Sequence, residues 1–122
     1  GHALSATGNT LQAVRQHRPD DVLTDPGAAD LTVHVDFDAL ARAAGGGVQH
    51  FGPCGQGDFL RALGIEVRAA HLNATATPDQ ARDIASSVAR LIAPDQMGTL
   101  FKVLVLAHLD MEPPPGFEHA QV

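Results

Sequence analysis

The sequence predicts an α/β fold, in which strands and helices alternate along a single domain. Residues 31–35 alternate between apolar and polar side chains, and this period of two fits an extended segment with one polar face. Residues 81–92 repeat apolar side chains at helical spacing. Residues 100–107 form an almost continuous run of aliphatic side chains, which is typical of a strand buried on both faces of a sheet.

The first half of the chain contains short expected elements separated by glycine and proline. Residues 1–30 hold many breakers, so we expect a long loop with one short helix over residues 10–17. Asp36 is expected to cap a helix over residues 37–44, which the glycine run at 45–47 ends. A short strand over residues 48–51 should end at Gly52 and Pro53.

The second half is more helical. One helix is expected over residues 57–72, with Gly64 as a break inside it. Thr77, Pro78 and Gln80 fit the N-cap, first and third positions of a second helix, which ends before Pro94. The strand of residues 100–107 then completes a domain of residues 1–110. Residues 111–122 are rich in proline, and we expect a mobile tail there.

Composition excludes several classes of protein. The 122 residues suffice for one domain, and hydrophobic residues make up 44% of them, which is ordinary for a folded chain. The net charge is -6 and the basic residues are scattered, which argues against nucleic-acid binding. The single cysteine excludes an internal disulfide and a cysteine-rich zinc site. No apolar run approaches the ~20 residues of a membrane span. Abundant Arg, Ala and Gly are typical of a GC-rich bacterial genome.

The main candidate site is the polar face of residues 30–36. Asp30, Thr32, His34 and Asp36 can share one face of an extended segment. Carboxylates beside an imidazole can hold a cationic substrate or move a proton. The alternative is structural, with Asp36 capping a helix, Asp30 beginning a turn and His34 in solvent.

Two further motifs have a structural alternative that we favour. The string from Gly52 to Gly57 precedes a helix and could present N–H groups to an anion, but it matches no dinucleotide or phosphate-loop fingerprint. A tight turn between strand and helix is therefore the better interpretation. Cys54 lacks an electropositive setting in the sequence, which favours a packing thiol over a nucleophile. The seven histidines never show the spacing of metal ligands on a helix.

Residues 26–37 and 95–104, with several shorter strings, resemble the MidA family of S-adenosylmethionine-dependent methyltransferases, which includes a mitochondrial arginine methyltransferase that assists complex I assembly. The resemblance covers most of residues 1–106. The strings that carry it are Gly1-His2, Asn9-Thr10-Leu11-Gln12, residues 26–37, Gly52-Pro53, residues 56–60, Leu63-Gly64-Ile65 and residues 95–104. The most specific parts are the string with Asp30, Thr32, Asp36 and Phe37 and the string with Met97-Gly98. Cys54-Gly55 departs from the family, whose members often have a polar residue before the glutamine.

The resemblance implies the C-terminal part of a class I, Rossmann-like methyltransferase fold, with the first strands of the sheet absent. It implies transfer of a methyl group to arginine on a partner protein, with a respiratory-complex subunit as a candidate acceptor. S-adenosylmethionine would be bound mainly by the absent N-terminal part, because the glycine loop and the ribose-binding acid of the family are not found here. Composition and family together predict a cytoplasmic protein.

The same resemblance suggests roles for individual residues. Asp30, Asp36 and His34 are the expected catalytic residues, since methyl transfer to a guanidinium needs carboxylates that orient the cation and a group that accepts its proton. His2, Thr32 and Gln56 are the expected substrate-binding residues, with His2 at the carboxyl end of a central strand, where α/β sheets place ligands. The alternative left open is a non-catalytic protein-binding module or an inactive scaffold of the same fold.

Overall fold

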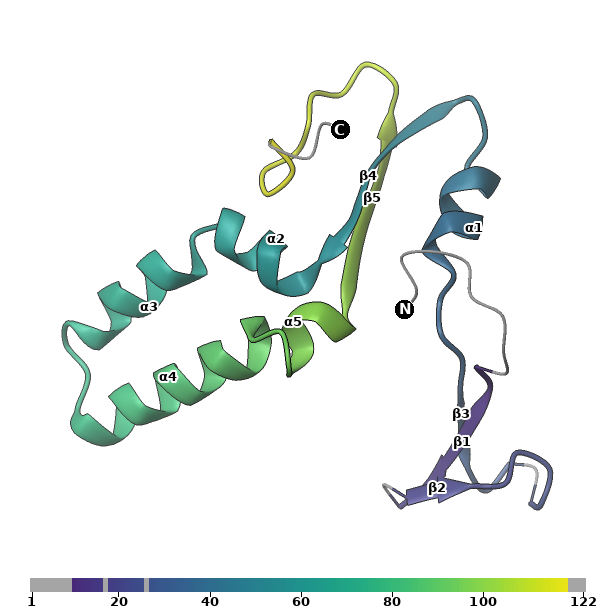
Figure 1. Ribbon diagram of the computed structural model, residues 1–122, viewed down its shortest axis with the longest axis horizontal. Helices are drawn as coiled ribbons and strands as arrows, with labels where there is room; N and C mark the ends of the chain where they lie inside the picture. Colours follow the sequence, from purple (N-terminus) through teal and green to yellow (C-terminus); the bar gives the residue numbers. More distant parts are fainter. Residues whose placement is uncertain (1–9, 17, 26, 119–122) are drawn as a thin grey trace.

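The computed structural model describes residues 10–16, 18–25 and 27–118. A small three-stranded sheet lies at one end of the molecule, and a hairpin of two helices extends at the other (Figure 1). A two-stranded sheet and two short helices lie between these ends. The expected mixture of helices and strands is confirmed, but both sheets are antiparallel.

The small sheet has the strand order β2-β1-β3. It consists of β1 (Gln12–Arg15), β2 (Arg18–Asp20) and β3 (Asp30–Thr32). The helix expected over residues 10–17 is therefore wrong, because this short segment pairs on both sides, with Val14 opposite Pro19 and Asp30. An apolar period this short is compatible with either a helix or a strand, and tertiary pairing decides between them. An ion pair of 2.8 Å between Arg15 Nε and Asp20 Oδ2 also links β1 to β2.

The extended segment after Asp30 leads into a helix as expected. Strand pairing ends at Thr32, so the strand is shorter than the predicted 31–35. Helix α1 spans Phe37–Ala43, and the Asp36 carboxylate accepts a hydrogen bond of 2.9 Å from the Ala39 backbone N–H. That bond satisfies one of the free N–H groups at the start of the helix, which confirms the predicted N-cap.

The second sheet is an antiparallel pair of long strands that are far apart in the sequence. Strand β4 (Val48–Gly55) pairs antiparallel with β5 (Lys102–His108), and the register shifts between Phe51 and Cys54. Strand β4 therefore continues past Gly52 and Pro53, where the sequence predicted its end. The prediction that the last strand is buried on both faces is also wrong: most of β5 is half-buried, and only Ala107 in it is buried.

The helices follow the sequence signals closely. The helix expected over residues 57–72 is present as α2 (Gln56–Ala62) and α3 (Ile65–Asn73). Gly64 separates them with a φ of 83°, a left-handed conformation that glycine adopts at little cost. Helix α4 spans Pro78–Ile92, and Thr77 and Gln80 form the predicted capping box. A short helix α5 (Met97–Leu100), which the sequence did not predict, precedes β5.

The C-terminal segment folds back over the middle of the molecule. Phe117 is only 1% exposed and is the most buried large side chain among the described residues. Its ring centroid lies 5.4 Å from that of Phe59 on α2 and 6.3 Å from that of Phe51 on β4. Residues 111–118 therefore pack against α2 and β4, although the sequence predicted a loose tail here. The boundary expected at residue 110, and the mobility of the segment, remain predictions.

Candidate functional site

The polar segment from Asp30 to Asp36 extends along one edge of the molecule. Asp30 and Thr32 are the first and last residues of β3, and both are exposed. His34 is exposed in the link between β3 and α1, and Asp36 is half-buried at the start of α1. Because the side chains alternate along an extended chain, these four residues can face one side while Leu31, Val33 and Val35 face the other. The structure thus places four of the six predicted site residues in one continuous segment.

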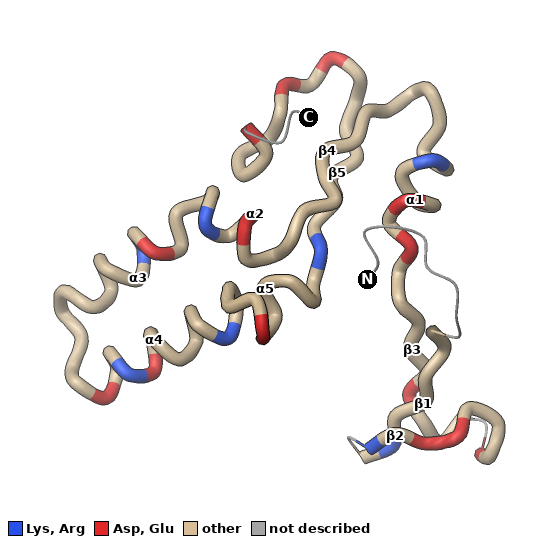
Figure 2. Tube along the Cα trace, in the orientation of Figure 1, with Lys and Arg blue, Asp and Glu red and all other residues tan. Residues whose placement is uncertain are grey.

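Negative charge is concentrated around this segment. Residues 20–38 contain six aspartates and no Lys or Arg, and the tube view shows acidic positions along β3 and at the start of α1 (Figure 2). Within the described residues, Arg15 offsets part of this charge through its ion pairs with Asp20 and with Asp25, at 2.8 Å and 3.1 Å. The segment that carries Asp30 and Asp36 is therefore suited to attract a cationic group.

The remaining two predicted residues are not part of this segment. His2 lies outside the described residues. Gln56 begins α2, which packs with α4, α5 and β4. Its side-chain Nε2 donates a hydrogen bond of 3.0 Å to the Leu91 carbonyl oxygen. The structure thus gives Gln56 a structural contact at the end of α4, and it does not place the residue beside Asp30 or Asp36.

A close-packed junction joins two of the strings that resemble the methyltransferase family, residues 56–60 and residues 95–104. The side chain of Arg61 donates to the Ile92 carbonyl oxygen at 3.2 Å, so Gln56 and Arg61 together satisfy two of the last carbonyls of α4. Gly57 and Gly98 are both buried beside this point. A Cβ atom at Gly57 would lie 2.6 Å from the Ile92 oxygen, and one at Gly98 would lie 2.2 Å from it.

The sequence analysis missed this junction, although its signals were present. Gly57 precedes Arg61 by one helical turn, and Gly98 follows shortly after the proline that ends α4. Glycines at such positions mark places where backbones approach closely. The glycines of the string from Gly52 to Gly57 thus serve packing, at least at Gly55 and Gly57, whose Cβ positions face Gly98 and Ile92. This supports the favoured interpretation of a tight strand-to-helix connection.

Cys54 is a half-buried thiol on β4. Burial raises its pKa, and the nearby Asp58 carboxylate raises it further, while Lys102 acts in the opposite direction. The thiol is therefore protonated near neutral pH, which makes it a poor nucleophile. This agrees with the packing role expected from the sequence. Among the described residues there is also no group of three or more His, Cys, Asp and Glu side chains placed to hold a metal ion.

Residues 1–54 match a family model described as "Putative S-adenosyl-L-methionine-dependent methyltransferase". The chain is 41% identical to the mitochondrial protein arginine methyltransferase NDUFAF7 homolog of Drosophila melanogaster, over 96% of this chain and 28% of that protein. It is 38% identical to the mitochondrial protein arginine methyltransferase NDUFAF7 of Rattus norvegicus, over 87% of this chain and 24% of that protein. The chain thus spans about a quarter of the length of these relatives.

Solved structures agree with the sequence comparison. A COG1565 superfamily member from Burkholderia thailandensis, bound to S-adenosyl-homocysteine, aligns with a TM-score of 0.75 and 31% identity. The alignment covers 91% of this chain and 29% of that one. The fold of this chain is therefore that of one portion of a methyltransferase of this superfamily. The chain is therefore similar to S-adenosylmethionine-dependent methyltransferases of the MidA-like family, as the sequence resemblance indicated.

The comparisons also correct one prediction and leave another unsupported. The cytoplasmic location expected from composition and family is wrong, because the relatives from fly, rat and human are mitochondrial proteins. The same relatives are eukaryotic, so they do not support the bacterial origin suggested by composition. As to membranes, no helix in the described part of the chain has the length and hydropathy needed to cross one.

Proposed function

We propose that the protein containing this chain is an S-adenosylmethionine-dependent methyltransferase that modifies arginine on a partner protein. The observation that carries the proposal is the 41% identity, over 96% of this chain, to a protein arginine methyltransferase. The likeness to a structure with bound S-adenosyl-homocysteine supports the choice of methyl donor, since that molecule is what remains after the methyl group has been transferred.

Gly55, which precedes α2, and Gly57, within α2, pack against Gly98 and Ile92, so they leave no room for a cofactor at that point. We therefore propose that other parts of the protein bind most of the methyl donor. When bound, it would supply an activated methyl group on a sulfonium. In this proposal the present chain binds the arginine that accepts the methyl group.

The acceptor role rests on the acidic segment. We propose that the carboxylates of Asp30 and Asp36 orient a guanidinium group, and that Thr32 and His34 donate or accept hydrogen bonds beside them. Attack by a guanidinium nitrogen releases a proton, and a carboxylate or the imidazole of His34 can accept it. Asp36 would combine this role with capping α1, where its Oδ1 accepts a hydrogen bond from the Ala39 backbone N–H. The predicted roles of His2 and Gln56 in substrate binding remain proposals without a supporting contact.

We also propose that this chain packs onto the first strands of a class I methyltransferase sheet. The apolar side of the extended segment supports this, because Leu31, Val33 and Val35 are 59%, 62% and 49% exposed. Burying three such side chains would contribute roughly 1.5–3 kcal/mol for each one that becomes fully buried.

The methyl acceptor in this proposal is an arginine on a protein. The relatives are named as protein arginine methyltransferases, which supports a protein rather than a small molecule as substrate. A respiratory-complex subunit is one candidate, in keeping with the mitochondrial names of those relatives. Identification would come from mass spectrometry of methylated arginines in cells with and without the gene.

The test uses the complete gene product that contains this chain, with labelled S-adenosylmethionine and candidate acceptor proteins. Asp30→Asn and Asp36→Asn remove the two carboxylates, and asparagine at position 36 still caps the helix. We expect methyl transfer to arginine by the unaltered protein and at least about a 100-fold loss in each variant, a typical contribution of acid–base groups. Glu112→Gln, an equal loss of charge at an exposed residue elsewhere, is the control. Full transfer by both aspartate variants would show that the proposed site is wrong.

A non-catalytic protein-binding module is the second candidate. Many large apolar side chains are exposed, among them Leu23 at 82% and Val67 at 67%, and such surface is common where proteins bind one another. The same assay separates the two functions. A complete gene product that binds neither the methyl donor nor its demethylated product, yet unfolds cooperatively, would favour the binding module.

A further inference from the structure

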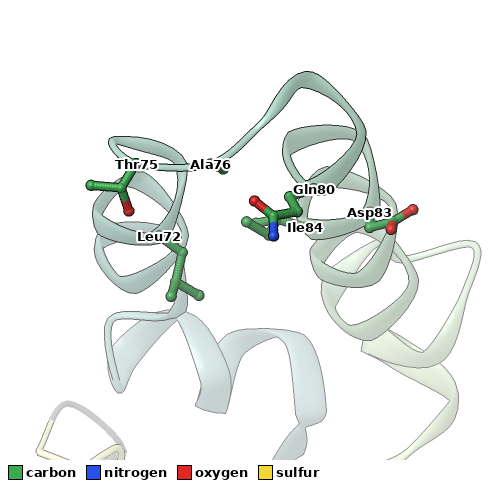
Figure 3. Close-up of a pocket in the computed structure, with 6 residues that line it drawn as sticks. All are labelled: Leu72, Thr75, Ala76, Gln80, Asp83 and Ile84. Atoms are coloured by element: carbon green, nitrogen blue, oxygen red, sulfur yellow. The ribbon is translucent and has the colours of Figure 1, made fainter.

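The hairpin of α3 and α4 has a long apolar groove that nothing in the described structure covers. One part of the groove has a volume of about 390 Å³ and is bounded by apolar side chains of both helices. They include Ile65, Ala69, Leu72, Ile84, Val88 and Leu91. The groove continues toward the loop between the helices, where Leu72 and Ile84 point into the space between them (Figure 3).

Burial along the hairpin shows that no third layer of described residues covers it. No residue of α3 is buried, and in α4 only Ile92, at the end that meets α2 and α5, is buried. Ile84 and Val88 are half-buried, although they lie on the face of α4 that packs against α3. Two packed helices alone leave part of their apolar faces exposed to solvent, whereas a bundle of four helices can bury these faces.

One positive and one negative side chain border the groove, and their positions indicate what kind of surface can bind there. Arg68 on α3 and Asp83 on α4 both border the groove. Arg68 stands five residues before the last residue of α3, and Asp83 stands five residues after the first residue of α4, so they lie at the same height on the hairpin. In the described part of the chain neither forms an ion pair or a side-chain hydrogen bond. Asp83 points away from α3 (Figure 3).

A surface with a cation on one side and an anion on the other, at equal heights, is complementary to itself. A two-fold axis parallel to the helices places α3 of one copy against α4 of the other. Arg68 then meets the partner subunit's Asp83, and the same contact recurs on the other side of the axis. This is the property that an isologous interface requires, in which one patch binds a second copy of itself.

We propose that the α3–α4 groove binds the same groove of a second copy, so that two hairpins form a four-helix bundle. The apolar side chains of Ile84, Val88 and Leu72 form the centre of this interface. The two pairs of Arg68 with the partner subunit's Asp83 fix its orientation. Other protein chains with an apolar helix could fill the groove, but they would not need the matched heights of these two charges.

Charge reversal tests the proposal in the complete gene product, with the dissociation constant of the dimer measured by analytical ultracentrifugation. Asp83→Arg and Arg68→Asp each place like charges together at both contacts. We expect each to raise the dissociation constant about tenfold per contact, or about 100-fold in all. The double variant R68D/D83R exchanges the charges and should restore the dimer. Glu112→Arg lies outside the hairpin and changes the net charge by as much as Asp83→Arg does. This control should leave the dissociation constant unchanged.

Both substituted residues are exposed, so the single variants should remain folded, with far-ultraviolet circular dichroism spectra like that of the unaltered protein. A protein that is monomeric at every concentration would overturn the proposal. So would a dimer that none of the reversals affects, because its interface would then lie elsewhere. A loss in both single variants without recovery in the double variant would also overturn it, since the paired charges would then not specify the contact.

Discussion

Substitution of Gly98 by alanine gives the sharpest test of the junction between α2, α4 and α5. A Cβ atom at this position would lie 2.2 Å from the Ile92 carbonyl oxygen, 2.5 Å from its carbon and 2.8 Å from the Ala93 oxygen. All three are backbone atoms, so no side chain can rotate away. The Gly98 N–H also donates to the Ala93 oxygen at 3.1 Å, which holds Gly98 against the end of α4.

The size of the effect follows from two opposing contributions. Forcing one extra methyl into a packed site costs typically about 1–3 kcal/mol and sometimes more, and overlap with fixed backbone favours the upper end. Alanine also restricts the unfolded chain, which returns about 0.4–1 kcal/mol. We therefore expect a net loss of about 2–3 kcal/mol, or roughly a 10 °C decrease in melting temperature for a domain of this size.

Thermal unfolding of Gly98→Ala followed by circular dichroism measures this loss. Gly46→Ala is the matched control, because its Cβ would meet nothing within 4 Å and its φ lies outside the left-handed region. The control should melt within about 2 °C of the unaltered protein, as surface changes usually do. A Gly98→Ala variant as stable as Gly46→Ala would show that α5 does not pack against the end of α4 as described.

Three further predictions concern separate features. Phe117→Ala removes the most buried aromatic ring of the described residues and should cost about 3 kcal/mol or more, measured by urea unfolding; no change would mean that residues 111–118 do not pack on α2. Thr77→Ala removes the capping-box hydroxyl and should cost about 1 kcal/mol in the same assay, whereas Thr77→Ser should cost much less. Cys54 should react with iodoacetamide more slowly than a free cysteine at neutral pH, and its rate should keep rising with pH beyond the point where that of a free cysteine levels off, because burial and Asp58 raise its pKa; fast labelling at neutral pH would contradict this.

Local signals in the sequence predicted α1 to α4, although they missed α5 and wrongly predicted a helix over residues 10–17. The capping residues Asp36 and Thr77 and the break at Gly64 act through contacts within a few residues, so their pattern is readable without knowledge of the fold. Strands depended on partners that lie far away in sequence. Ala13 is buried in β1 because β2 and β3 pair with it on both sides, and nothing in residues 10–17 alone distinguishes this from a helix.

The candidate site was predictable only in part for the same reason. Alternation placed Asp30, Thr32, His34 and Asp36 in one extended segment, and the structure keeps them there. Gln56 instead bonds to the Leu91 carbonyl oxygen, 35 residues further along the chain. A contact across that separation depends on how α2 meets α4, which no local pattern specifies. The likeness to known methyltransferases indicated the family, but it does not by itself assign a role to a side chain.

The measurement that tests the central claim most directly is calorimetric titration of S-adenosyl-homocysteine into the complete gene product that contains this chain. The similarity to the methyltransferase family and to a structure with this molecule bound predicts saturable binding at one site per chain. Binding should also raise the melting temperature, because a ligand stabilises the folded state that it binds. A cooperatively folded protein that shows neither heat of binding nor a change in melting temperature, at any concentration of the ligand, would contradict the proposed methyltransferase function.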